Sequence, residues 1–325
     1  MAMSDARTEV LDWVARGLLP RERAADALLL AGVTPSAMQW RAFLDRLLLW
    51  MGIAALAAAM VFFVAANWDA LGRFGKFALV EGAIVLALAT CIWRGLDAPA
   101  GRASLVAAAL LTGALFALVG QVYQTGADTF ELFAVWAVVI FAWVMLGCQP
   151  ALWVIWLVLV NVAIALYYST FGGFLGVVFS PPAALWVLFI VDTAALIVWE
   201  ALAQSGVRWL DVRWAPRVLA VASGTAITFL ALWSIFEHWR SDGWHMLPYA
   251  LWIAAAYWAY RVRSVDLFIL AGAVLSLVVV ISLGLGRALS GMHDAGGFLF
   301  IALVLIASAA AGAFWLRQVA AEERT

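Results

Sequence analysis

The chain has 325 residues, of which 67% are hydrophobic and only 12% are charged. A soluble domain is about half apolar and about a quarter charged, so this composition indicates an integral membrane protein. The net charge of -1 provides no basic field that would attract nucleic acid, which excludes that class of partner.

Residues 1–45 mix acidic and basic side chains and lack the apolar core and cleavage site of a signal peptide. We expect short helices at 5–16 and 20–31 and a third helix that continues into the membrane. Residues that favour helix ends lie between these helices. Gly17 and Gly32 suit the ends of the first two, and Thr34 or Ser36 suits the start of the third. So small a unit cannot build a sizeable core. It is either a hairpin packed on the bundle or membrane interface, or a docking site for a protein partner.

Ten apolar stretches follow, each long enough to cross a bilayer, because about 20 helical residues span ~30 Å of hydrocarbon. They cover residues 47–66, 74–93, 103–123, 130–148, 151–170, 183–203, 216–236, 247–262, 266–285 and 297–316. The fold class predicted is therefore all-α, a polytopic integral membrane helical bundle of about ten transmembrane helices. The predicted domains are a cytoplasmic helical hairpin at 1–45, a transmembrane domain at 46–317 and a cytoplasmic tail at 318–325.

The distribution of basic residues predicts the orientation, since cytoplasmic loops are enriched in arginine and lysine. With ten spans both termini lie on one side, and fifteen of the 19 basic residues share that side. The other four are Arg73, Lys76, Arg240 and Arg287. We therefore expect a multi-pass protein of a bacterial inner membrane, with the lipid bilayer as its surroundings and both termini in the cytoplasm.

Two acidic residues, Glu81 and Asp192, lie well inside predicted spans. An ionised carboxylate there is unfavourable by several kcal/mol unless it meets water or a partner. Asn161 and Thr112 are candidate hydrogen-bond partners from other spans. One hypothesis is a proton or cation relay, extended from Asp192 toward Glu200, although solvation at the span end also explains Glu200. The other is a polar contact that holds helices together.

Several polar residues gather in loops predicted to face the outside. They are Asn67, Trp68, Asp69, Gln121, Tyr123 and Asp128. Helix capping is the alternative explanation for Asn67, Asp69 and Asp128. The three histidines, His238, His245 and His293, also fall in outer loops, but their spacing matches no metal motif, so we expect neither metal nor cofactor.

Three stretches are typical of one family. Residues 62–69 with Arg73, residues 113–136 with their Gly-Gln-Val-Tyr-Gln run, and the turn at 17–24 resemble the bacterial membrane-protein family called domain of unknown function 2157. The resemblance covers roughly residues 8–150. It implies no activity, substrate or cofactor, but it directs attention to the outer residues Asn67, Trp68, Asp69, Gln121 and Tyr123.

A loose internal similarity relates two predicted helix pairs. Thr112, Gln121 and Trp136 in one pair correspond to Thr225, Glu237 and Trp252 in the other. Internal repeats often frame transporter sites.

Our leading functional hypothesis is a transporter-like or channel-like protein for a small solute or ion, proton-coupled through Glu81 and Asp192. The alternative is a non-transporting membrane scaffold or sensor that assembles with partner proteins. A membrane enzyme is the third hypothesis, and no catalytic motif supports it. A transporter predicts a polar cavity that reaches one of the two acids, whereas a scaffold predicts that helix contacts enclose them.

Overall fold

The computed structural model describes residues 3–171, 181–236, 245–289 and 295–322, and within those ranges every regular element is a helix. The α-helices are α1 (Met3–Ala15), α2 (Ala24–Leu30), α3 (Ala37–Ala66), α4 (Arg73–Arg94), α5 (Pro99–Tyr123), α6 (Thr129–Gly147), α7 (Pro150–Phe171), α8 (Pro181–Gln204), α9 (Trp214–Phe236), α10 (Met246–Tyr257), α11 (Leu267–Ala288) and α12 (Ala295–Glu322). Short 3-10 turns lie at Arg21–Arg23 and Arg208–Leu210, and a π-helical segment, η3, covers Trp258–Arg263. The all-α prediction is confirmed.

Nine helices in the described part of the chain are long and apolar enough to cross a membrane: α3 to α9, α11 and α12. The remaining predicted span, 247–262, forms the short α10, and η3 continues it to Arg263. Each apolar stretch therefore corresponds to a helix. The polytopic helical bundle predicted from the sequence is confirmed.

The helix ends of the N-terminal segment have clear local causes. Gly17 and Gly32 adopt φ angles of 73° and 70°, the left-handed backbone that glycine tolerates best. Ser36 begins α3 with a capping box: its hydroxyl accepts from the Gln39 amide at 3.2 Å, and its own amide donates to the Gln39 side chain at 2.9 Å. From there α3 runs for 30 residues without a break.

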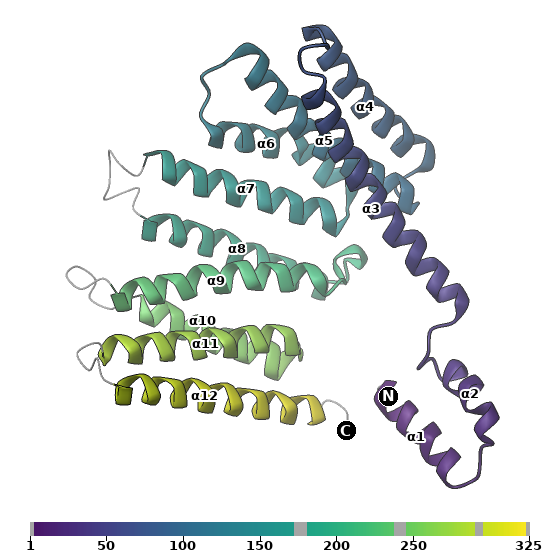
Figure 1. The fold of residues 1–325 in the computed structure, drawn as a ribbon, viewed down its shortest axis with the longest axis vertical. Coiled ribbons are helices and arrows are strands. Elements are labelled where there is room, and N and C mark those ends of the chain that lie inside the picture. Colours follow the sequence, from purple (N-terminus) through teal and green to yellow (C-terminus); the bar gives the residue numbers. More distant parts are fainter. Residues whose placement is uncertain (1–2, 172–180, 237–244, 290–294, 323–325) are drawn as a thin grey trace. The chain divides into compact units, whose positions relative to one another are not determined.

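The described part of the chain divides into two compact units, the first up to residue 111 and the second from residue 112 onward. In the first unit, α1 packs against α2 as a hairpin. In the second unit, α7, α8, α9, α11 and α12 run side by side in that order, and α10 packs on both α9 and α11 (Figure 1).

Helix α9 is the centre of the second unit. It contacts α8, α10 and α11, and its side chains Leu219, Ile227 and Leu230 are almost fully buried. One apolar cluster around Leu219 joins α7, α8, α9, η3 and α11. A second cluster around Ile227 joins α9, α10 and α11. These contacts fix the positions of the polar side chains that α9 carries.

Candidate functional site

Two of the predicted site residues in the second unit lie beside a cavity. A space of about 890 Å³ lies where α5 ends and α6 begins, and it is lined by Gln121, Gln124, Asp128 and Glu131 among others. The connection adopts left-handed backbone at Gln124, with a φ of 45°. Two of the predicted site residues, Gln121 and Asp128, therefore share this cavity. Tyr123 is exposed and does not line it.

Asn67, Trp68 and Asp69 belong to the first unit. Asn67 follows α3 and donates its side-chain amide to the carbonyl of Phe63 at 2.9 Å, so it caps the end of a helix rather than the start. The ammonium group of Lys76 lies 3.4 Å from the ring centroid of Trp68, a cation–π contact in which the lysine is buried. Asp69 is exposed. Asn67 and Trp68 therefore both make local contacts, one with the end of α3 and one with Lys76 of α4.

Asp192 is one of the most deeply buried polar residues, with 2% of its surface exposed on α8. Asn161, on α7, donates its side-chain amide to the Asp192 carboxyl at 2.9 Å. The same amide group also donates to the carbonyl of Leu157 at 2.8 Å. The predicted partnership of Asp192 with Asn161 is therefore the one that the structure shows.

Glu81 has a different environment. It lies on α4 in the first unit and is exposed. No hydrogen bond or ion pair of Glu81 occurs among the described residues. The two acids are thus unlike in their surroundings: Asp192 is enclosed and paired, and Glu81 is not.

The comparisons with known proteins concern the N-terminal part of the chain. Residues 11–153 match the family described as predicted membrane protein (DUF2157). The resemblance predicted for roughly residues 8–150 is therefore confirmed. No curated protein and no solved structure matches the chain. The DUF2157 description and the nine apolar helices together make this a multi-pass membrane protein of unknown function.

The DUF2157 match ends inside α7, so most of the buried polar contacts lie beyond it. The Thr193 and Ser223 hydroxyls lie 2.6 Å apart between α8 and α9, and the Trp252 indole of α10 donates to Ser223 at 3.0 Å. A second group joins α9, α10 and α11 through two short contacts of Ser276. Its partners are the hydroxyls of Thr228 at 2.6 Å and Tyr249 at 3.0 Å.

Apart from Thr193, which lies on the predicted line from Asp192 toward Glu200, these hydroxyl groups were missing from the sequence-based site. Serine and threonine inside apolar spans were the available signal, because hydrocarbon offers a hydroxyl no partner except another protein group. In the structure each group links neighbouring helices, which is the role predicted for the polar contacts as an alternative to a relay.

An ionic cluster lies beside the start of α9. Arg213 donates to Glu200 of α8 at 3.3 Å and to Asp266 at 3.0 Å. Arg217 donates its Nε to the same Asp266 carboxylate at 3.1 Å. The Tyr260 hydroxyl donates to Glu200 at 3.1 Å. Glu200, interpreted from the sequence as a solvated group near a span end, is therefore part of a structured cluster.

Asp266 is the centre of that cluster, and its side chain is 1% exposed. Its carboxylate also accepts from the backbone amides of Phe268 and Ile269, so it caps α11. Burial alone raises the pKa of the Asp266 carboxyl, but hydrogen bonds from Arg217 and Arg213 outweigh it and lower the pKa below its ordinary value. The carboxylate is therefore held ionised.

Metal-binding side chains do not gather in the described ranges, where no group of three or more His, Cys, Asp or Glu forms. His245 is buried and its Nδ1 accepts from the Trp186 indole at 3.2 Å. The other two histidines, His238 and His293, lie outside the described residues.

Proposed function

We propose that the protein is a non-transporting membrane scaffold or sensor that assembles with partner proteins. The observation that carries this proposal is the enclosure of Asp192. Its carboxyl is buried against Asn161, and it lines none of the cavities of about 300, 890, 380 and 390 Å³ in the second unit. An intramembrane acid that moves protons or cations needs a water-filled cavity or a chain of polar partners.

The residues along the hypothetical relay path from Asp192 to Glu200 also support the scaffold proposal. A cavity of about 380 Å³ is lined by Thr193, Leu196 and Glu200, but its wall is largely apolar. The Thr193 hydroxyl pairs with Ser223, and Glu200 pairs with Arg213 and Tyr260. Within the described residues no hydrogen-bond chain joins Asp192 to Glu200. The polar groups are instead used as contacts between helices.

The N-terminal hairpin is the surface that we propose for partner binding. Its helices α1 and α2 pack together, and within it Val10 is only 3% exposed, whereas Leu30 is 86% exposed. Other large apolar side chains are also exposed on it: Leu11, Trp13, Leu18 and Leu29. So much exposed apolar surface on a small hairpin favours an interaction site over a free solvated face.

A flux measurement tests the absence of transport. The purified full chain is reconstituted into liposomes, and proton flux is followed with an internal pH dye under a potassium gradient with valinomycin. We expect wild type and Asp192→Asn to match empty liposomes. A flux that wild type supports and Asp192→Asn abolishes would overturn the proposal.

Photo-crosslinking in cells tests the partner surface. A photoreactive amino acid replaces Leu30, and the matched control places it at buried Val10 on the same hairpin. We expect a protein adduct of fixed mass from position 30 and none from position 10. Adducts with lipid alone would refute protein docking and place the hairpin in the membrane interface.

A second candidate function is a transporter-like protein, and the cavity at the end of α5 favours it. Gln121 and Asp128 bring an amide and a carboxylate to a space of about 890 Å³, which suits a polar or cationic solute. A solute-uptake screen in vesicles decides between the two. Uptake that Asp128→Asn abolishes and Tyr123→Phe leaves intact would favour transport over the scaffold.

A further inference from the structure

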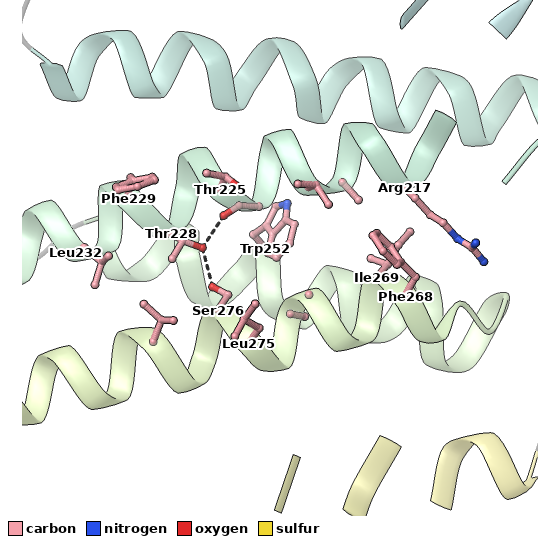
Figure 2. Close-up of a pocket in the computed structure, with 16 residues that line it drawn as sticks. Arg217, Thr225, Thr228, Phe229, Leu232, Trp252, Phe268, Ile269, Leu275 and Ser276 are labelled. Atoms are coloured by element: carbon pink, nitrogen blue, oxygen red, sulfur yellow. Dashed lines mark hydrogen bonds between the residues drawn. The ribbon is translucent and has the colours of Figure 1, made fainter. Parts of the chain in front are cut away.

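A long groove runs between α9 and α11, with Trp252 of α10 as its floor (Figure 2). Its volume is about 300 Å³ and its wall is almost wholly apolar. Three of the side chains that line it are each at least half exposed: Val221, Phe229 and Leu275. The groove therefore opens on the exposed surface of the α9–α11 pair. Both helices are candidate membrane spans, and an exposed apolar surface on such helices suits the hydrocarbon of a bilayer.

The groove is long and narrow rather than compact. On α9 its lining extends from Arg217 to Leu232, about 22 Å at 1.5 Å per residue. The bilayer hydrocarbon is ~30 Å thick, so the groove follows the membrane for more than one leaflet depth. Two of its three hydroxyls are already engaged, since Thr228 bonds to the Gly224 carbonyl and to Ser276, and the third belongs to Thr225. An extended acyl chain fits this surface better than a polar solute.

One end of the groove carries a cation with free donors. Arg217 lines that end, and its side chain is 41% exposed. Only its Nε is engaged, by Asp266, and neither terminal nitrogen donates a hydrogen bond to the described residues. The guanidinium also lies 5.7 Å from the Phe268 ring centroid, which fixes it at the groove. Two adjacent terminal N–H groups are the arrangement that binds a phosphate oxygen pair.

We propose that this groove is a binding site for one phospholipid molecule. The terminal nitrogens of Arg217 donate to its phosphodiester, and one acyl chain lies along the floor made by Trp252. The terminal donors of Arg217 remain for this occupant, because Asp266 is shared with Arg213 and accepts from Arg217 only at Nε. The proposal stands independently of the scaffold function.

A glycine on α11 provides a substitution that fills the groove without distorting the helix. A Cβ added at Gly272 meets nothing within 4 Å, so Gly272→Leu projects its side chain into open groove space. Gly82 on α4 is equally open and lies in the first unit, so Gly82→Leu is the matched control. Arg217→Lys keeps a positive partner for Asp266 but removes the paired terminal N–H groups.

Native mass spectrometry of the full chain in detergent, titrated with phosphatidylglycerol, measures the site. We expect wild type and Gly82→Leu to retain one lipid, and Gly272→Leu and Arg217→Lys to bind about tenfold more weakly. Thermal unfolding confirms that the variants are folded. Equal lipid retention by wild type and Gly272→Leu refutes the site.

Two further arms distinguish other occupants. Diacylglycerol, which lacks the phosphate, should bind more weakly than phosphatidylglycerol to wild type, and equal binding refutes the phosphate contact with Arg217. Excess inorganic phosphate should displace little lipid, and full displacement refutes the acyl-chain contact. A dimer that disappears in Gly272→Leu, with no lipid bound in wild type, assigns the groove to a second copy and overturns the proposal.

Discussion

The indole ring of Trp252 lies directly against the backbone of Gly224, where an added Cβ would be 2.8 Å from the nearest ring carbon. The absence of a side chain at Gly224 thus lets α10 approach α9. The same relationship recurs between α5 and α6, where the Trp136 ring lies against Gly113. The two helix pairs whose sequences are loosely similar therefore share a packing contact, glycine beneath tryptophan, between consecutive helices.

We expect Gly224→Ala to destabilise the protein by about 1–3 kcal/mol, because the new methyl group overpacks the contact with Trp252. Helix propensity alone acts in the opposite direction, by about 0.5–1 kcal/mol. Gly272→Ala is the matched control, since its Cβ meets open space on α11. Thermal unfolding in detergent should therefore show a lower midpoint for Gly224→Ala only. Equal midpoints for the two variants would contradict a tight Gly224–Trp252 contact.

The Asp192–Asn161 pair predicts a graded series. Asp192→Asn keeps an acceptor for the Asn161 amide and should change stability little, whereas Asp192→Leu leaves one N–H of that partly buried amide unmatched and should destabilise by about 1 kcal/mol. A double-mutant cycle with Asn161→Leu should give a coupling of about 0.6 kcal/mol, the average for such bonds in membranes. Additive effects in the cycle would mean that the bond contributes nothing to stability.

The positions of the helices could be predicted because a chain that crosses hydrocarbon has few backbone conformations open to it. Each apolar stretch must satisfy its backbone internally, so its length alone located a helix. The short α10 agrees with the predicted span, but its π-helical continuation was not predicted, and neither was the hydrogen bond that Tyr260 of this segment donates to Glu200. Ser36 was one of two candidate caps, and its pairing with Gln39 distinguishes it from Thr34.

The site was predicted unevenly for a physical reason. Asp192 lies deep in a span, so its need for a partner was visible, and Asn161 was among the few polar residues available. Glu200, Arg213 and Asp266 lie near helix ends, where water could solvate each of them separately. Only the packing of α8, α9 and α11 brings them together.

Removal of the Asp266 carboxylate should have a large effect. Asp266→Ala leaves Arg213 and Arg217 without their shared partner and also removes the cap of α11. We expect the free energy of unfolding to fall by about 3 kcal/mol. This value is at the low end of the range for breaking a buried ion pair, because both arginines are partly exposed to solvent. Asp266→Asn should lose less, since its side-chain oxygen can still cap α11. Thermal unfolding at pH 7 measures both, and a reversed order would refute the charge contribution.

The lowered pKa of Asp266 also predicts a pH dependence with a definite sign. A carboxyl whose pKa is lower in the folded state stabilises that state above its unfolded pKa, about 3.9, and loses the contribution as pH falls through the folded value. The difference in unfolding midpoint between wild type and Asp266→Asn should therefore be constant from pH 7 to about pH 5 and shrink below about pH 4. A difference that grows on acidification would contradict this assignment.

The orientation in the membrane can be tested by cysteine accessibility. The excess of basic residues beside the termini leads us to propose that both termini are cytoplasmic. Asp128→Cys would then lie outside and Ser205→Cys inside, both at exposed positions. The background requires Cys91→Ala and Cys148→Gly, because Cys148 has a φ of 42°, which glycine accepts without strain.

An impermeant thiol reagent applied to intact cells should label position 128 and leave position 205 unlabelled until the membrane is permeabilised. Labelling at 205 but not at 128 would invert the orientation and place the ionic cluster around Asp266 on the outer side. Labelling at both positions in intact cells would mean that α6, α7 and α8, the helices between them, do not cross the membrane an odd number of times. The labelling pattern therefore tests the orientation and the assignment of these three helices as separate spans.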